Sequence, residues 1–416
     1  MVYKESNLKF SKSSKYNILI QRVNYLFILV ILFIGLSCST EEPIIPSEIE
    51  NVYLTESSEI QELSRTEFTS LLTNSLGSAA GQLSAFVQSG IKAVKLSYST
   101  TTTDGKTITA SGLMVIPTDI QSPMALGSIQ HGTIFSDSLA PSYFQLQSEG
   151  LSGALLASTG VIVCMPDYVG YGASSSEPHP YEHNKGLAQA NVDFLLAVKE
   201  YIRNAKLNWN NNLMLAGYSE GGYATMATQK MLEEKYPMEF DIKASTLGAG
   251  AYNKTATMRV FLTDSRKGEI NQNRSYIRVI NTYNRIYGLN RPLSDFYVEP
   301  YLSQISQNGE LAEIEVSFSE ILNPQFTANI LNGTDTGFIS AVADNDIFDW
   351  KSNSRMSLIH GDADTYVPYI NSETAVNAMK AKGSNISLNT IADGDHGSTI
   401  QSFFFETLNM FSEFKN

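Results

Sequence analysis

From about residue 118 to its end, the chain alternates short apolar runs with longer stretches whose apolar residues recur at helical spacing. The apolar runs cover residues 126–130, 161–165, 213–216, 244–247, 356–359 and 386–391, and the helix-like stretches include residues 187–202, 222–235, 372–382 and 399–414. Strands that alternate with amphipathic helices form a mostly parallel sheet covered on both faces. The alternation therefore predicts an α/β fold.

An antiparallel hairpin is predicted ahead of this region, in residues 93–117. Apolar and polar residues alternate over 94–98, Asp104-Gly105 supplies a turn, and an apolar run resumes at 113–116. Before the hairpin, Ser64-Arg65-Thr66-Glu67 has the pattern of a capping box and predicts the start of a helix. The sheet should therefore be mixed, with antiparallel strands leading into parallel ones.

The N-terminus has the pattern of an export signal. Residues 1–24 carry five basic residues and one acid, and residues 25–36 are an uncharged run of 12. A membrane-spanning helix needs about 18 or more apolar residues, so we expect a signal peptide over 1–37. Cys38 lies where bacterial lipoproteins carry their lipidated cysteine, and Glu41-Glu42 resembles the tags of surface-exposed lipoproteins. We expect an exported protein anchored by lipid on Cys38 to a bacterial membrane, with the surface-exposed face of an outer membrane as one option; the alternative to a lipoprotein is an ordinary cleaved signal peptide.

The charge and the cysteine content exclude several classes of partner. The chain holds 29 Lys+Arg against 42 Asp+Glu, a net charge of −13. A nucleic-acid binder gains its affinity by neutralising phosphates, so no nucleic-acid partner is expected. Attraction to an anionic membrane surface is disfavoured for the same reason, which leaves the lipid on Cys38 as the only expected membrane contact. Two cysteines rule out a disulfide framework and a Cys-rich zinc site, and no metal is expected.

One long segment interrupts the alternation. Residues 252–350 separate two core strands by 99 residues, which is too long for a connection and rich in helix-like apolar positions. We expect an inserted, mainly helical cap that acts as a lid. The predicted organisation is a signal peptide (1–37), a polar tether (38–63), the first part of the core (64–251), the cap (252–350) and the second part of the core (351–416).

A glycine-rich turn follows the apolar run 213–216. Its sequence is Gly217-Tyr218-Ser219-Glu220-Gly221-Gly222, a G-x-S-x-G motif between a predicted strand and a predicted helix. Residues without Cβ let the strand and helix approach closely, so the serine hydroxyl projects above the sheet. Ser219 is therefore a candidate nucleophile, and the alternative is a glycine-rich turn with an incidental serine.

A nucleophilic serine needs a base and an orienting acid, and in this arrangement both follow it in the chain. Only His360 and His396 lie downstream of Ser219. His360 is too close to a strand end to reach the serine and is interpreted as a turn residue bonded to backbone. His396 is then the candidate base. Asp364 is the candidate acid, with Asp362 as its rival.

The mechanism also needs donors for the negatively charged oxygen of the reaction intermediate. The run 126–130 ends in His131-Gly132-Thr133. The backbone N–H groups of Thr133 and Glu220 are the candidate oxyanion hole. The alternative for His131-Gly132 is a plain turn at a strand end.

These residues resemble those of the α/β-hydrolase superfamily, and within it the secreted esterases and lipases of the secretory-lipase type. The resemblance runs from about residue 93 to the C-terminus and rests on residues 130–133 with Asp137, residues 166–172 with 179–181, residues 217–222, and residues 360–368 with 395–397. It implies Ser219 as nucleophile, Asp364 as acid and His396 as base. It also places a lid where the 252–350 insertion lies.

The sequence therefore predicts a serine carboxylic-ester hydrolase that forms an acyl-enzyme on a small-molecule ester or lipid, without a cofactor. A serine peptidase of the prolyl-oligopeptidase type and an acyltransferase are the enzymatic alternatives. A non-catalytic binding lipoprotein is least favoured, because all three members of the triad are present.

Overall fold

The computed structural model describes residues 50–415 apart from 77–82 and 146–147. The predicted signal peptide, Cys38 and most of the predicted tether lie outside these residues. None of the helices in the described part of the chain is long and apolar enough to cross a membrane.

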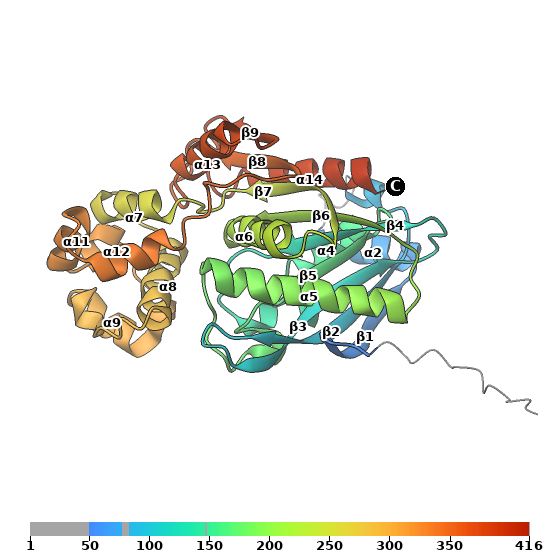
Figure 1. The fold of residues 1–416 in the computed structure, drawn as a ribbon, viewed down its shortest axis with the longest axis horizontal. Helices are drawn as coiled ribbons and strands as arrows, with labels where there is room; N and C mark the ends of the chain where they lie inside the picture. Colours follow the sequence, from blue (N-terminus) through green and yellow to red (C-terminus); the bar gives the residue numbers. More distant parts are fainter. Residues whose placement is uncertain (1–49, 77–82, 146–147, 416) are drawn as a thin grey trace, which may run out of the picture. The chain divides into compact units, whose positions relative to one another are not determined.

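A nine-stranded mixed sheet forms the centre of the fold, with the strand order β1-β2-β3-β5-β4-β6-β7-β8-β9 (Figure 1). The strands are β1 Leu54–Leu63, β2 Ile91–Thr101, β3 Thr107–Pro117, β4 Met124–Gln130, β5 Ile162–Pro166, β6 Trp209–Tyr218, β7 Asp241–Gly248, β8 Arg355–Gly361 and β9 Ile386–Ile391. The pairs from β1 to β5 in this order are antiparallel, and the pairs from β5 to β9 are parallel. The predicted mixed sheet with an N-terminal antiparallel hairpin is therefore confirmed.

Helices cover both faces of the sheet. They are α2 Arg65–Leu76, α4 Gly150–Ala157, α5 Asn184–Asn204, α6 Glu220–Lys235, α13 Ile370–Ala381 and α14 Ile400–Phe414. Two apolar clusters fill the space between sheet and helices. One joins Phe194 of α5, Met226 of α6 and Val376 of α13 to the strands, and the other joins Phe68 of α2 and Phe411 of α14. This two-sided burial explains why the parallel strands read as continuous apolar runs.

The predicted start of α2 has the geometry of a capping box. The Glu67 N–H donates to Ser64 Oγ at 3.3 Å, and the Ser64 N–H donates to Glu67 Oε2 at 2.9 Å. Two backbone donors at the helix start are thus satisfied by neighbouring side chains.

Two elements differ from the sequence-based prediction. Residues 54–63, assigned to the tether, instead form the edge strand β1, so the predicted tether is too long. The side chains of β1 are nearly all exposed, and the strand is held by its backbone pairing with β2, which leaves no alternating apolar pattern to detect. Helix α4 was not predicted; nearly all its residues are buried, so it too lacks an amphipathic period.

Helices α7 Lys254–Thr263, α8 Ile270–Ile286, α9 Tyr301–Asn308, α10 Phe318–Ile321, α11 Pro324–Leu331 and α12 Thr336–Ala343 fill the segment between β7 and β8 (yellow to orange in Figure 1). They have an apolar cluster of their own, in which the rings of Phe296, Phe326 and Phe338 pack edge to face or tilted with centroids 5.1–5.7 Å apart. The segment is mainly helical, as expected, and it packs as a unit with its own core.

Candidate active site

Ser219 lies on the turn between β6 and α6, in a backbone conformation that non-glycine residues rarely adopt (φ 59°, ψ −123°). The turn is tight because its neighbours lack side chains. A Cβ at Gly217 would collide with the carbonyl of Gly221, and a Cβ at Gly221 would collide with the carbonyl of Gln130 on β4. The Ser219 N–H donates to the Gly248 carbonyl at 2.8 Å and fixes the turn against β7. The strained serine is thereby held at the carboxyl edge of the sheet.

The structure brings Ser219, His396 and Asp364 into one hydrogen-bonded chain. The His396 Nε2 atom lies 3.0 Å from Ser219 Oγ, and its Nδ1 atom lies 2.7 Å from Asp364 Oδ2. The ionised carboxylate of Asp364 can only accept hydrogen bonds, so it selects the imidazole tautomer with a proton on Nδ1. The Nε2 atom is then free to accept a hydrogen bond from the serine. This is the geometry that a serine nucleophile and its base require.

The carboxylate of Asp364 is buried and held by four donors. Besides His396, the backbone N–H groups of Tyr366 and Val367 donate to Oδ1 at 2.8 and 2.9 Å, and His360 Nε2 lies 3.2 Å from Oδ2. Burial raises the pKa of Asp364, but the bonds from His360 and His396 outweigh this effect and lower the pKa to about 2. The carboxylate is therefore charged at any pH at which the protein would act.

His360 contacts two side chains in addition to the backbone group that the sequence predicted. Its Nε2 atom lies 3.0 Å from the Val367 carbonyl, as a backbone-satisfied turn residue would. However, the same atom also reaches Asp364, and Nδ1 lies 2.8 Å from Ser372 Oγ. The interpretation as a plain turn residue was thus incomplete, because the link to Asp364 depends on how the loop after β8 folds back.

The rival acid, Asp362, does not contact His396. It is exposed, and its Oδ1 atom accepts from the Asp393 N–H at 2.7 Å. Asp395, next to His396, accepts from the N–H groups of Gly397 and Ser398 at 3.0 and 2.7 Å and shapes the loop. Of these aspartates, Asp364 alone is bonded to the imidazole of His396.

Two tyrosines hold the imidazole of His396 in place. The Tyr366 ring stacks on it with centroids 4.7 Å apart and planes 13° apart. The Tyr218 hydroxyl donates to the His396 carbonyl at 2.7 Å. Neither tyrosine was identified as a site residue from the sequence, although both lie within stretches that carry the family resemblance, Tyr218 in 217–222 and Tyr366 in 360–368.

One predicted oxyanion donor, Thr133, lies on the loop after β4, and the other, Glu220, is the first residue of α6. Gly132 N–H donates to Glu149 Oε1 at 2.8 Å, whereas the N–H groups of Thr133 and Glu220 have no acceptor within the part of the chain that the structure describes. Thr133 Oγ1 is 2.8 Å from the Tyr181 hydroxyl, which fixes the loop beside Ser219. N–H groups without an acceptor in the protein are what an oxyanion hole requires.

The Glu220 side chain turns away from the serine into the protein. Its Oε1 atom lies 2.7 Å from His179 Nε2, and His179 Nδ1 lies 2.7 Å from the Val169 carbonyl. Burial disfavours the carboxylate, but the contact with His179 outweighs it and lowers the pKa of Glu220. This link between His179 and the start of α6 was not predicted, because it depends on where the loop that carries His179 lies in space.

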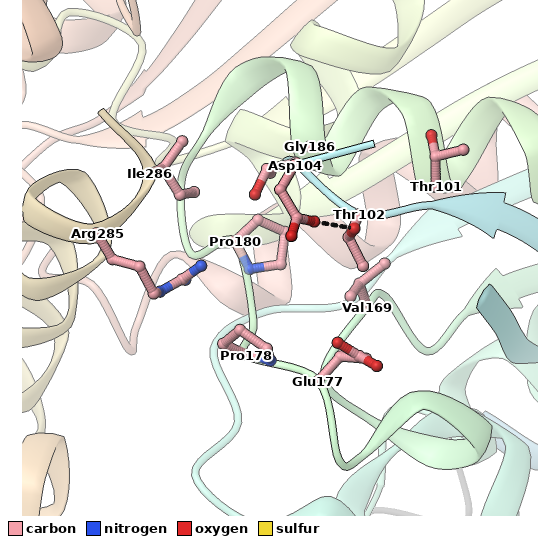
Figure 2. A pocket seen from close by; sticks show the side chains of 11 residues that line it. Thr101, Thr102, Asp104, Val169, Glu177, Pro178, Pro180, Gly186, Arg285 and Ile286 are labelled. Atoms are coloured by element: carbon pink, nitrogen blue, oxygen red, sulfur yellow. Dashed lines mark hydrogen bonds between the residues drawn. The ribbon is translucent and has the colours of Figure 1, made fainter. Parts of the chain in front are cut away.

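A cavity of about 350 Å³ lies beside the loop 177–180 (Figure 2). Thr102 and Asp104 of the β2–β3 turn line one side, and Arg285 and Ile286 of α8 line the other. No member of the Ser219, His396 and Asp364 chain contributes to its wall, so it is not the space in which the serine would react.

Two family models match parts of the chain. A secretory lipase model matches residues 138–268, which include Ser219, and a prolyl oligopeptidase family model matches residues 325–414, which include Asp364 and His396. No curated protein sequence shows significant similarity to the chain.

Solved structures share the fold across most of the chain. A putative hydrolase from Legionella pneumophila has a TM-score of 0.76 at 23% identity and covers 87% of this chain and 98% of its own. The rice cell wall degrading esterase LipA from Xanthomonas oryzae has a TM-score of 0.70 at 22% identity, with 86% and 96% covered. Candida antarctica lipase A in its closed state has a TM-score of 0.59 at 16% identity, with 85% and 82% covered.

The solved structures share the α/β-hydrolase fold with this chain, and the secretory lipase model matches the segment that carries Ser219. Together these similarities support a carboxylic-ester hydrolase. The match to a secretory lipase model also agrees with the predicted export, while lipidation of Cys38, outside the described residues, stays a prediction.

Proposed function

We propose that the chain hydrolyses carboxylic esters through an acyl-enzyme on Ser219, with His396 as the base and Asp364 as the orienting acid. The observation that carries this proposal is the continuous hydrogen-bonded chain from Ser219 Oγ through both nitrogens of His396 to Asp364. The strained turn at Ser219 and the charged state of Asp364 support it.

The reaction would proceed in two halves. Ser219 Oγ attacks the ester carbonyl while His396 Nε2 takes its proton, and the N–H groups of Thr133 and Glu220 stabilise the oxyanion. His396 then gives the proton to the leaving alcohol, and the acyl group stays on the serine. Water, deprotonated by His396, attacks the acyl-enzyme, and His396 returns that proton to Ser219 Oγ as the carboxylic acid leaves. Asp364 stabilises the imidazolium in both halves.

A peptidase is the second candidate, because the model matching residues 325–414 describes the prolyl oligopeptidase family. That segment carries the acid and the base, whereas the nucleophile lies in the segment that matches the secretory lipases. We therefore favour the ester, and an acyltransferase would differ only in excluding water. Comparing hydrolysis of a p-nitrophenyl ester with that of the corresponding p-nitroanilide separates esterase from peptidase.

The substrate is proposed to be a small-molecule ester or a lipid, met outside the cytoplasm. Solved structures with this fold include a cell wall degrading esterase and a lipase. We further propose that the segment 252–350 contributes to substrate access, and that lipid on Cys38 anchors the enzyme to a membrane. A panel of p-nitrophenyl esters of increasing acyl length would define the preferred acyl chain.

The decisive test is Ser219→Ala. The variant should fold, because the lost hydroxyl leaves no core cavity, and it should lose ester hydrolysis by about 10⁵-fold or more together with labelling by a serine-directed phosphonate. Ser303→Ala, on an exposed face of α9, is the matched control and should behave as the wild type. Near-native turnover by purified Ser219→Ala would contradict the proposal.

A further inference from the structure

Helix α8 of the inserted segment is hydrogen-bonded to the loops that follow β4, β5 and β8. Gln272 Nε2 donates to the Thr365 carbonyl at 2.6 Å, and the Tyr276 hydroxyl donates to the Tyr366 carbonyl at 2.8 Å. Farther along, the Tyr283 hydroxyl donates to the Glu182 carbonyl at 2.9 Å. These bonds join α8 to backbone carbonyls, so the helix sets the course of the loops themselves.

Arg278, near the middle of α8, reaches the loop that carries Thr133. Its Nη1 atom donates to the Ile134 carbonyl at 3.1 Å and to the Tyr171 hydroxyl at 2.9 Å, and Tyr171 in turn donates to the same carbonyl at 2.8 Å. The Nη2 atom pairs with Glu310 Oε1 at 2.7 Å. The residue directly after Thr133 is thus held by two donors that are themselves linked.

The guanidinium also packs between two rings of the same region. It lies 4.9 Å from the centroid of Phe135 and 5.1 Å from that of Tyr181, and the Tyr181 hydroxyl is the partner of Thr133 Oγ1. Two contacts therefore fix the backbone around Thr133. Tyr181 binds the Thr133 side chain, and Arg278 binds the carbonyl of the next residue, Ile134.

Burying a charged guanidinium costs desolvation free energy, which only its hydrogen bonds and ion pairs can offset. Arg278 is only 4% exposed, and its Nε atom has no partner among the described residues. An apolar side chain would fill the same space without that desolvation cost. What an apolar residue could not supply is the directed bond to the Ile134 carbonyl, which orients the adjoining peptide.

We propose that Arg278 is a positioning residue for the oxyanion hole, through which the inserted segment controls the rate of the chemical step. The inference rests on the proposed function, because it presumes that the Thr133 N–H serves the oxyanion formed at Ser219. It makes α8 a fixed part of the active site, whatever motion the other helices of the segment undergo.

Replacing Arg278 should weaken the stabilisation of states in which the oxyanion has formed and leave substrate binding nearly unchanged. Deleting an oxyanion donor outright costs about 10²–10³ in kcat, so misaligning one should cost about 10–100-fold. The KM for a small acetate ester should change by less than about threefold, because the ground-state carbonyl barely uses the hole.

The test compares Arg278→Met with Arg291→Met in the full chain. Arg291 is a suitable control: it also stacks on a ring, that of Phe296 at 4.7 Å, and pairs with Asp295 and Asp335, but all these partners lie within the inserted segment. The readouts are kcat and KM for p-nitrophenyl acetate, together with the inhibition constants of a trifluoromethyl ketone and its alcohol. The serine adds to the ketone and generates an oxyanion, whereas the alcohol forms none.

Arg278→Met should weaken the binding of the ketone by about the factor by which it lowers kcat/KM, and it should leave the binding of the alcohol unchanged. Arg291→Met should resemble the wild type in both. Should Arg278→Met fail to fold, Arg278→Lys, which keeps the charge but not the forked donors, should show the same pattern. If Arg278→Met weakened the binding of ketone and alcohol equally, or if the two Met variants behaved alike, the inference about Arg278 would be wrong. The proposed function would not be affected by that result. A wild type that neither hydrolyses the ester nor binds the ketone would overturn the proposed function as well.

Discussion

Asp364 shows how one carboxylate can be charged although it is buried. Its two oxygens accept from His396, His360 and two backbone N–H groups, so the ionised form is satisfied on both sides. Asparagine at this position would offer an NH₂ group that repels the Nδ1–H and favours the wrong imidazole tautomer.

Exchange of this acid should therefore be far more damaging than exchange of its neighbour. We expect Asp364→Asn to lower kcat on the order of 10⁴-fold, as loss of the correct tautomer does in other triads. Asp362→Asn removes only a bond to the Asp393 N–H and should change kcat little. Steady-state kinetics of the two purified variants checks this ranking, and the reverse order would transfer the role to Asp362.

The low pKa of Asp364 also predicts a pH-dependent contribution to stability. A carboxyl whose pKa falls from 3.8 to about 2 on folding stabilises the native state fully above pH 4, and this gain is lost as the pH falls through 2. The shift corresponds to about 2 kcal/mol. Urea unfolding should show the advantage of the wild type over Asp364→Asn shrinking by roughly this amount between pH 5 and pH 2. A constant difference would contradict the assignment.

Among single residues, the sequence predicted those whose role follows from a local motif. Ser219 is set by the glycines around it, and His396 is one of only two downstream histidines. The bonds of His360 to Asp364 and of His179 to Glu220 were missed because each depends on where a loop returns in space. The spacing of residues along the sequence does not show where a loop will lie in the folded protein.

Among the elements, those with an apolar period were predicted and those without one were not. Strand β1 is polar because it is an edge strand, and exposed charged side chains protect such edges from pairing with other molecules. Helix α4 is almost wholly buried, so no face distinguishes it from a strand. The sequence alone could therefore predict the centre of the sheet better than its edge.

The first residue of α7 gives a test of how the inserted segment is attached to the core. Lys254 forms a buried ion pair with Glu182, and burial lowers the pKa of Lys254 and raises that of Glu182. Lys254→Met should cost about 3–5 kcal/mol, because it leaves a buried charge without a partner. Adding Glu182→Leu should recover most of that loss.

Chemical denaturation measures both effects, with Lys185→Met as the control. Lys185 pairs with Asp344 on the surface, with 66% of its side chain exposed, so its loss should cost under about 1 kcal/mol. If Glu182→Leu brought no recovery, the pair would owe its effect to packing and not to charge.

For the whole molecule, the question is whether the inserted segment can be separated from catalysis. It has its own apolar core, which favours an independent unit, but α8 bonds to the loops that carry the catalytic residues. We expect a variant with residues 254–345 replaced by a short linker to lose hydrolysis of even a small acetate ester, by at least the 10–100-fold expected for Arg278→Met. A folded deletion variant that kept acetate hydrolysis and changed only its acyl-length preference would show that the segment is a lid and nothing more.

The position of that segment also has a consequence for the order in which the enzyme is completed. Strand β7 receives its neighbour β8 only after roughly 100 further residues have been synthesised, which at about 5–20 residues per second takes some 5–20 seconds. During that interval the sheet has an open edge, and the proposed acid and base of Ser219 have not yet been synthesised. The proposed nucleophile therefore comes early in the chain, and the proposed triad can form only after the C-terminal part of the chain has folded.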